Sequence, residues 1–251
     1  METDSMLAKG LRVLRHLMQH PHGQGVSTIA RAQNLPVSTT HRMLSTLVAT
    51  NWVTRSPSAT YRLGPQMFLA VEAMHASSGL SDMHSILTDL ADSVGETVIL
   101  GTLIGQEFIY LDVIHGPGLL GIKGSVGQRG PLHCTAIGKS LLTALPSPQR
   151  EELIQTLELR SFTANTITDS ADLSAEIDRS VRRGYTEANE ENEVGVTSVG
   201  IPVPIQHDPD GRYAMCVSAP TQRAGADRRR DFLAALTRCR DVLRTAGVSP
   251  R

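Results

Sequence analysis

The chain has 251 residues, of which 40% are hydrophobic and 20% charged, and its formal net charge is −1. This composition is that of an ordinary globular protein and excludes disordered or low-complexity chains. No apolar run approaches the roughly 18 residues that a membrane-spanning helix needs, so no membrane partner is expected. The opening stretch lacks the basic-then-apolar order of a signal peptide, and three scattered cysteines make no disulfide framework. A cytoplasmic location is therefore expected.

The charge is distributed unevenly along the chain. Residues 1–62 carry seven Lys or Arg and two acidic residues, a net charge of +5. The remaining residues carry 17 basic and 23 acidic ones, a net charge of −6. This split indicates a basic module attached to a mildly acidic one. A basic module attracts polyanions, with nucleic acid the first candidate; an uneven but merely solvated surface is the alternative.

The N-terminal residues have the pattern of a helix-turn-helix. Residues 7–18 are apolar at helical spacing and predict an amphipathic helix, after which "PHGQG" breaks the chain. Ser27 and Ser38 are candidate N-caps of two further helices, and Asn34 tolerates a left-handed turn between them. The last of these helices leaves hydrogen-bonding side chains on its outer face. Its predicted DNA-contacting residues are Ser38, Thr39, His41, Arg42, Ser45 and Thr46.

A wing follows the third helix. Residues 52–55 and 60–63 are strand-like runs, separated by a turn at 56–59. Arg55 and Arg62 flank this hairpin and are placed to reach a phosphate backbone or a minor groove. The pattern predicts a winged helix-turn-helix that binds double-stranded DNA, although such modules sometimes serve only to dock other proteins.

The rest of the chain mixes helices with strands. Helices are expected at about 65–77, 80–93, 136–145, 147–157, 172–183 and 227–246. Strands are expected at about 96–105, 107–116, 196–205 and 212–219. This order predicts an α+β sheet domain. The expected parts are a DNA-binding domain at 1–64, a linker helix at 65–78 and a second domain at 79–251.

The stretch "PLHCTAIGKSLL" carries features of two enzyme classes. A phosphate-binding P-loop requires a glycine five residues before Gly138, where this chain has His133. A thiol nucleophile requires its base nearby, but His133 and Cys134 are adjacent on an extended segment and point in opposite directions. Neither enzymatic interpretation is therefore favoured by this stretch.

Two other interpretations of this region remain. A metal site would draw on Asp112, His115, His133 and Cys134. Their spacing matches no strong ligand motif, and neither a metal nor a cofactor is expected. Alternatively, Thr135 caps a helix whose free N–H groups bind a small carboxylate, or the capped helix binds nothing. Lys139 in this helix is expected to be solvated.

The chain resembles the IclR (isocitrate lyase regulator) family of bacterial transcription factors over essentially its whole length. The resemblance is carried by "GLRVLRHL", "STIARAQNLPVSTTHRMLSTLV" with "YRLG", "GQRGPLHCTAIGKSLLTALP" and "RRGYTEANEENEVGVTSVGIPVP". It implies a winged helix-turn-helix, a linker helix and a GAF-like effector domain with a mixed or antiparallel sheet. It also implies a homodimer or dimer of dimers on a pseudo-palindromic operator, controlled by a small organic or aromatic acid rather than engaged in catalysis.

The resemblance further implies the residues that line the effector pocket. They are Leu119, Ile122, Cys134, Thr135, Ala136, Ile137, Asn189, Glu191, Val196, Ser198 and Ser218. Members often carry an acidic residue where this chain has Ala188-Asn189, and some carry cysteine in place of Ser198; these departures leave the effector's identity open. An alternative also stays open, in which the C-terminal domain is a thiol- or metal-dependent enzyme tethered to a DNA-binding module.

Overall fold

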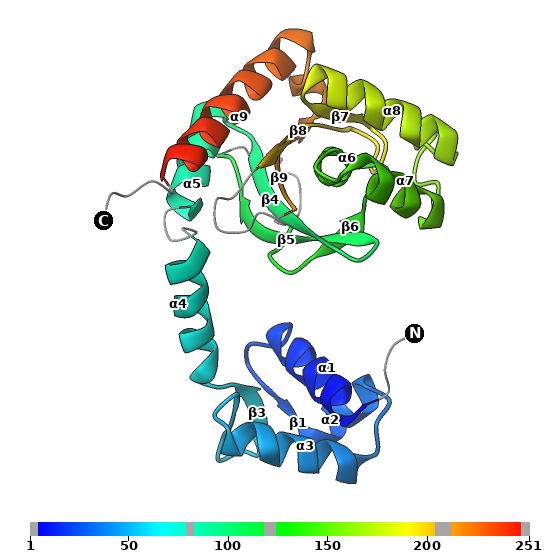
Figure 1. Ribbon diagram of the computed structural model, residues 1–251. Coiled ribbons are helices and arrows are strands. Elements are labelled where there is room, and N and C mark those ends of the chain that lie inside the picture. The colour runs from blue at the N-terminus through cyan, green and yellow to red at the C-terminus, as the bar shows by residue number, and fades with distance from the viewer. Residues whose placement is uncertain (1–4, 79–82, 118–123, 204–211, 247–251) are drawn as a thin grey trace. The chain divides into compact units, whose positions relative to one another are not determined.

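In a computed structural model, residues 5–78, 83–117, 124–203 and 212–246 are described (Figure 1). The chain divides into two compact units, Met1–Ser77 and Ser78–Arg251. In the described part of the chain, no helix combines the length and apolarity that crossing a membrane requires. Leu119 and Ile122, predicted to line the effector pocket, lie outside the described residues.

The N-terminal unit combines helices with a small sheet. Its helices are α1 (Met6–Met18), α2 (Val26–Ala32), α3 (Val37–Ala49) and α4 (Gln66–Ser78). Its strands are β1 (Gln24–Gly25), β2 (Val53–Arg55) and β3 (Thr60–Leu63), which form an antiparallel sheet in the order β1-β3-β2. Val13, Ile29 and Leu44 meet in a fully buried core beneath α1, α2 and α3. This is a winged helix-turn-helix, with β2 and β3 as the wing.

The turns of this unit follow the sequence prediction more closely than the helix caps do. Asn34, between α2 and α3, has φ +52°, which confirms the predicted left-handed turn. Helix α2 starts at Val26 with Gly25 at its N-cap, and α3 starts at Val37 with Pro36 at its N-cap, neither with a side-chain cap. The predicted capping roles of Ser27 and Ser38 are therefore wrong, because both helices begin two residues earlier than expected.

The C-terminal unit is built on one six-stranded antiparallel sheet in the order β6-β5-β4-β9-β8-β7. The strands are β4 (Thr97–Ile104), β5 (Glu107–Ile114), β6 (Arg129–Pro131), β7 (Thr186–Asn189), β8 (Val196–Val203) and β9 (Tyr213–Pro220). All neighbouring pairs in it are antiparallel, which confirms the predicted α+β class. The short strands β6 and β7 were not predicted, because neither contains an alternating apolar run.

Helices cover both faces of this sheet (Figure 1). One face carries α5 (Met83–Val94) and α9 (Ala226–Ala246), with a short 3-10 helix, η2 (Thr221–Arg223), before α9. The other face carries α6 (Ala136–Thr143), α7 (Ser147–Thr156) and α8 (Ser170–Arg183). Each face has its own hydrophobic core, with Leu87 and Phe232 in the first and Ile137 and Leu141 in the second.

Two glycines, Gly200 of β8 and Gly138 in the first turn of α6 itself, allow this helix to pack closely against its surroundings. A Cβ atom on Gly200 of β8 would lie 2.8 Å from Ser140 Oγ and 2.9 Å from the Ala136 carbonyl oxygen. A Cβ atom on Gly138 would lie 2.5 Å from Leu132 Cα. Side chains at either position would push the helix away, so the two glycines set where its N-terminus lies.

Candidate DNA interface and ligand cavity

Helix α3 presents a polar face to solvent and buries the opposite one. Thr40, Met43 and Leu44 are buried in the core of the N-terminal unit. Of the predicted DNA-contacting residues on α3, Thr39 is half-buried and the others are exposed: Ser38, His41, Arg42, Ser45 and Thr46. The predicted face is thus accessible, and its binding of DNA stays a prediction.

Two hydroxyls on this face bond to their own helix. Ser45 Oγ donates to the His41 carbonyl at 2.9 Å, and Thr46 Oγ1 donates to the Arg42 carbonyl at 3.2 Å. Such back-bonding satisfies each hydroxyl proton but leaves oxygen lone pairs available to a donor. The exposed guanidinium of Arg42 is therefore the strongest candidate on α3 for direct contact with a base or phosphate.

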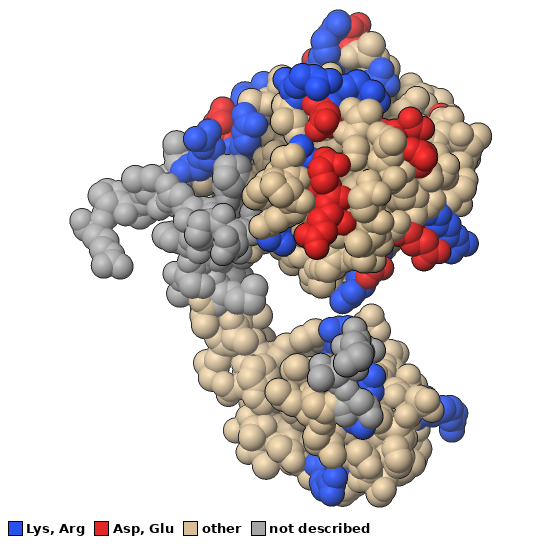
Figure 2. All heavy atoms as spheres, turned by 45° about the vertical axis from the view of Figure 1, so that its right-hand side comes forward, with Lys and Arg blue, Asp and Glu red and all other residues tan. Residues whose placement is uncertain are grey.

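The wing adds two further cations. Arg55 and Arg62 are exposed on β2 and β3. Arg55 Cζ lies 5.8 Å from the centroid of the Tyr61 ring, and Arg62 Nε donates to Thr54 Oγ1 at 3.4 Å. On the face shown in Figure 2, the described part of the N-terminal unit displays Lys and Arg without acidic side chains. The C-terminal unit displays both signs there, in keeping with the uneven charge along the sequence.

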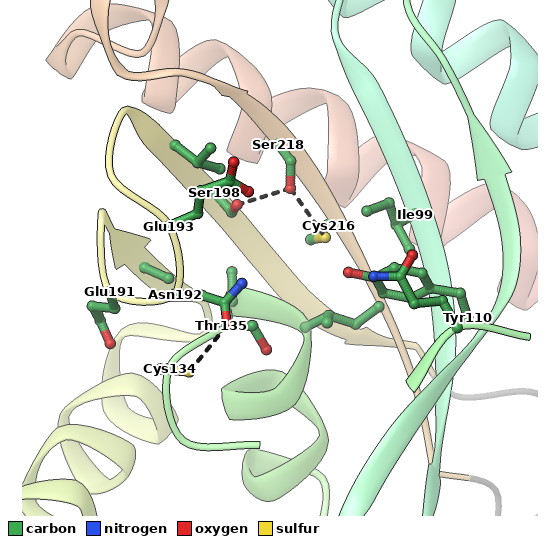
Figure 3. Close-up of a pocket in the computed structure, with 15 residues that line it drawn as sticks. Ile99, Tyr110, Cys134, Thr135, Glu191, Asn192, Glu193, Ser198, Cys216 and Ser218 are labelled. Carbon is green, nitrogen blue, oxygen red and sulfur yellow. Dashed lines mark hydrogen bonds between the residues drawn. The ribbon is translucent and has the colours of Figure 1, made fainter. Parts of the chain in front are cut away.

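A cavity of about 90 Å³ lies in the C-terminal unit, between the start of α6 and the inner face of β4, β8 and β9 (Figure 3). Residues 190–195, which connect β7 to β8 and are called the rim segment below, close one side of it. The lining residues are Ile99, Tyr110, Gln128, Cys134, Thr135, Ala136, Ile137, Ala188, Glu191, Asn192, Glu193, Val196, Ser198, Cys216 and Ser218.

The cavity brings together most of the residues predicted for the effector pocket. Those present in its lining are Cys134, Thr135, Ala136, Ile137, Glu191, Val196, Ser198 and Ser218. Asn189 is exposed and is not part of this lining; its Oδ1 atom accepts a hydrogen bond from Thr197 Oγ1 at 2.8 Å. Side chains alternate along β7, so Ala188 faces the cavity instead. Asn189 is thus the neighbour of a lining residue, and its contact with an effector stays a prediction.

Several lining residues were missed by the sequence analysis. They are Ile99, Tyr110, Gln128, Ala188, Asn192, Glu193 and Cys216. Pairing of β4 with β9 places Ile99 opposite Cys216, two residues before Ser218 and therefore on the same face of the sheet. The alternation of the C-terminal strand was a usable signal for Cys216, whereas Tyr110 and Gln128 depend on a strand order that the sequence does not specify.

The first turn of α6 forms one wall. Thr135 Oγ1 accepts a hydrogen bond from the Gly138 amide at 3.0 Å, which confirms Thr135 as the N-cap, and donates to the Pro131 carbonyl at 3.1 Å. The N–H groups of Ala136 and Ile137 belong to the first turn of the helix, where no carbonyl of the helix itself can accept their hydrogen bonds. This wall therefore carries the positive end of the helix dipole, which favours a negatively charged group.

The opposite wall carries neutral polar groups. Ser198 Oγ lies 2.8 Å from Ser218 Oγ, and Cys216 Sγ lies 3.7 Å from the same Ser218 oxygen (Figure 3). Burial raises the pKa of the Cys216 thiol to about 12, and it also raises the pKa of Tyr110. These groups are therefore protonated at neutral pH and can offer hydrogen bonds but no charge.

The charged groups in the lining are carboxylates. Glu191 and Glu193 both line the cavity, and among the residues that the structure describes no Lys or Arg lines it; residues 118–123, which include Lys123, lie outside that part of the chain. Lys139, predicted to be solvated, is 1% exposed, and its Nζ donates to both carboxylate oxygens of Glu191 at 2.7 and 2.9 Å. That prediction is wrong because α6 packs with nearly all its faces buried, and the rim segment supplies the counter-charge that a buried lysine requires.

The geometry does not support thiol catalysis at Cys134. Burial raises the pKa of this thiol to about 12, so the nucleophilic thiolate is scarce at neutral pH. Cys134 Sγ donates to Asn192 Oδ1 at 3.5 Å, whereas His133 Nε2 donates to the Arg160 carbonyl at 3.0 Å. Burial also lowers the pKa of His133. The two neighbours thus bond to different segments, as predicted, although the backbone at these residues forms a bend and not the expected extended segment.

The proposed ligands of a metal site do not converge either. Among the described residues, no three His, Cys, Asp or Glu side chains form a group that could hold a metal ion. Asp112 Oδ2 instead lies 2.7 Å from Nδ1 of His84, a residue that was not among the predicted metal ligands.

A winged helix-turn-helix joined to an α+β domain with its own cavity defines a DNA-binding transcriptional regulator with a separate effector domain. The family model described as "Bacterial transcriptional regulator IclR C-terminal" matches residues 72–244. The model described as "IclR helix-turn-helix domain" matches residues 6–57. The chain belongs to the IclR family of bacterial transcriptional regulators.

Similar proteins agree with this assignment. The probable transcriptional regulator SauR of Cupriavidus necator is 32% identical over 243 residues, 96% of each chain. The regulator XynR of Escherichia coli is 30% identical over 89% of this chain and 86% of its own. The Thermotoga maritima IclR structure has a TM-score of 0.71 at 27% identity, covering 96% of this chain and 98% of that one. These relatives are transcriptional regulators, not enzymes, which argues against the enzymatic alternative.

Proposed function

We propose that this protein binds a pseudo-palindromic operator through α3 and the wing, and that a small monocarboxylic acid in the C-terminal cavity modulates this binding. The observation that carries the proposal is the cavity itself. One wall of the cavity is a helix N-terminus, and no Lys or Arg of the described residues lines the cavity. The same chain carries a DNA-binding module. The predicted DNA-contacting and effector-contacting residues described above carry the two functions.

The proposed operator symmetry follows from a proposed homodimer or dimer of dimers. Two helices of the N-terminal unit leave apolar side chains uncovered: Leu7 on α1 is 73% exposed, and Phe68 on α4 is 76% exposed. Leu11 and Leu69 continue these surfaces at 55% and 62% exposure. Burying them against a second copy would remove apolar area from water. A two-fold dimer would then present two copies of α3 to two half-sites.

The charge of the cavity favours a monoacid over a diacid. One carboxylate fits the amides at the start of α6, and an attached hydroxyl or carbonyl group fits Ser198 and Ser218. A second carboxylate would share the cavity with Glu193, whose side chain is also in the lining. Like charges repel one another, so a dicarboxylate is the poorer ligand.

The cavity size sets the panel of acids to be tested. Its volume of about 90 Å³ is below the roughly 150 Å³ of a cavity that holds benzene, which favours short aliphatic acids. A solved IclR homologue from Microbacterium hydrocarbonoxydans, 23% identical, is a complex with 4-hydroxybenzoate. At this identity the likeness concerns the fold and not the ligand. Aromatic acids are therefore tested as a competing class, and their binding would require the cavity to widen.

The proposed mechanism is a shift between two conformational populations. An acid that binds one arrangement of the C-terminal units more tightly than another favours that arrangement, and with it one spacing of the two recognition helices. The direction of the shift decides between release and tightening on the operator. Reciprocity requires that operator DNA change the affinity for the acid by the same factor.

The test combines ligand binding with DNA binding. Short aliphatic, hydroxy, oxo and aromatic monoacids, with dicarboxylic acids as controls, are screened by thermal shift. Those that stabilise the protein are then added to a fluorescence anisotropy titration with DNA from beside its own gene. The proposal expects a monoacid that stabilises the protein and changes DNA affinity, both effects being lost in Ser198→Leu. Stabilisation without any effect on DNA binding would contradict it.

A further inference from the structure

The ion pair between Lys139 and Glu191 has no part in the function proposed so far. Lys139 lies on α6 and Glu191 in the rim segment, and their side chains are only 1% and 12% exposed. Burial of two charges is costly, and apolar residues of similar volume often give a fold as stable or more so. Fold stability alone is therefore a weak reason for an ion pair at this place.

The rim segment is held in a defined shape by contacts from three sides. Thr163 Oγ1 donates to the Glu190 carbonyl, and Thr166 Oγ1 donates to the Glu191 carbonyl, each at 2.6 Å. Glu190 has φ +55°, a left-handed conformation that is strained for this residue type. Cys134 Sγ reaches Asn192 at 3.5 Å. The bidentate contact of Lys139 with Glu191 is the charge-assisted member of this set, and it ties the rim segment to α6.

We propose that Lys139 and Glu191 are positioning residues of the effector cavity. Their ion pair holds the rim segment against the start of α6, so that Asn192 and Glu193 already border the cavity before an acid arrives. A preformed site binds more tightly because less ordering remains to be done on binding. The part of this inference that concerns acid affinity rests on the proposed function; the part that concerns the rim segment does not.

Replacing both partners by apolar residues separates positioning from mere stability. Lys139→Met together with Glu191→Leu removes the pair without leaving a lone buried charge, so thermal stability is expected to stay close to that of the wild type. The matched control removes another bidentate pair of the same unit, Arg223–Glu96, whose two bonds are 2.7 Å long. Its residues do not line the cavity. The control is Arg223→Met with Glu96→Leu.

Hydrogen exchange of the amides in residues 190–195 is the direct readout, and it needs no ligand. The apolar double variant is expected to exchange there about tenfold faster than the wild type, since local opening becomes easier. The control variant is expected to leave these amides unchanged. The reversed pair, Lys139→Glu with Glu191→Lys, keeps an ion pair between α6 and the rim segment. The folded form of this variant is expected to show slow exchange again. Equal exchange in the wild type and the apolar double variant would overturn the inference.

Calorimetric titration with pyruvate and with benzoate tests the link to ligand affinity. For a probe that binds the wild type, the apolar double variant is expected to bind about tenfold more weakly, and the control variant with equal affinity. Unchanged acid affinity would overturn that link. If neither probe binds the wild type, the proposed effector class loses its support, and the exchange experiment alone decides whether the pair positions the rim segment.

Discussion

Helices α3 and α6 both begin near hydroxyl-bearing residues but have opposite environments. Each carries one Lys or Arg in its first two turns, Arg42 in α3 and Lys139 in α6. Arg42 is exposed, whereas Lys139 is buried and paired with Glu191. The difference arises from what covers each helix: α3 packs on one side, while α6 lies between the sheet, α8 and the rim segment. A cation is therefore available to an external anion in the first case and is already neutralised in the second.

The largest expected effect is the loss of stability when one partner of the buried pair is removed. Lys139→Met leaves Glu191 without its counter-charge and is expected to lower the free energy of unfolding by about 3–5 kcal/mol. Urea denaturation followed by circular dichroism measures the change. A loss below about 1 kcal/mol, the range of exposed ion pairs, would mean that Lys139 is solvated after all.

This deficit is expected to depend on pH. Burial raises the pKa of Glu191, and without Lys139 the pKa rises further. The folded state of the variant then binds a proton more readily than the unfolded state. Its deficit is greatest at neutral pH and shrinks as the pH falls through the raised pKa toward the unfolded value of roughly 4.3. Lys139→Met with Glu191→Gln, which cannot titrate there, is the control and is expected to show no such recovery.

On α3 the expected loss is in DNA binding and not in stability. Arg42→Ala is expected to weaken operator binding by about 1–3 kcal/mol and, where the contact is to a phosphate, to reduce the salt dependence by about one ion. Anisotropy titrations at several salt concentrations measure both. Arg230→Ala, an exposed arginine of the C-terminal unit, is the control and should change neither. An Arg42 variant with undiminished affinity would remove α3 from the DNA interface.

The helix starts themselves provide a matched pair of smaller effects. Thr135 caps α6 through a hydrogen bond from Gly138, so Thr135→Ala is expected to cost about 1 kcal/mol of stability. Ser38 caps nothing, and Ser38→Ala is expected to change stability by less than about 0.5 kcal/mol. Thermal and urea unfolding compare the two. Equal losses would contradict the assignment of the caps.

The smallest expected effect concerns the charge of the cavity. Glu193→Gln removes a carboxylate from the lining and is expected to tighten binding of a monoacid by about two- to fivefold, and more at low salt. Calorimetry with a monoacid that binds the wild type measures this change. Glu158→Gln, an exposed residue outside the lining, serves as control. Weaker binding in Glu193→Gln would indicate a ligand that uses this carboxylate, such as one bearing an ammonium group.

The parts of the molecule that depend on local pattern were predictable from the sequence. Helix α3, its exposed face, the left-handed turn at Asn34 and the cap at Thr135 each follow from neighbouring residues. The remainder depends on residues far apart in the chain. The polar strand β7 exists because β8 pairs with it, and this pairing turns Ala188 instead of Asn189 toward the cavity. Nothing near Lys139 in sequence indicates that a carboxylate 52 residues later will cover it.

The most direct test is a footprint on the DNA beside the protein's own gene, recorded with and without candidate monoacids. It shows whether α3 binds DNA and whether an acid bound at the start of α6 controls that binding. The proposed function predicts two protected half-sites, about one helical turn or a multiple of it apart, whose protection changes when an effective acid is added. Protection that no acid changes, although one of them stabilises the protein through the cavity, would contradict the proposed control. Absence of any protected site would contradict the proposed binding of an operator in that DNA.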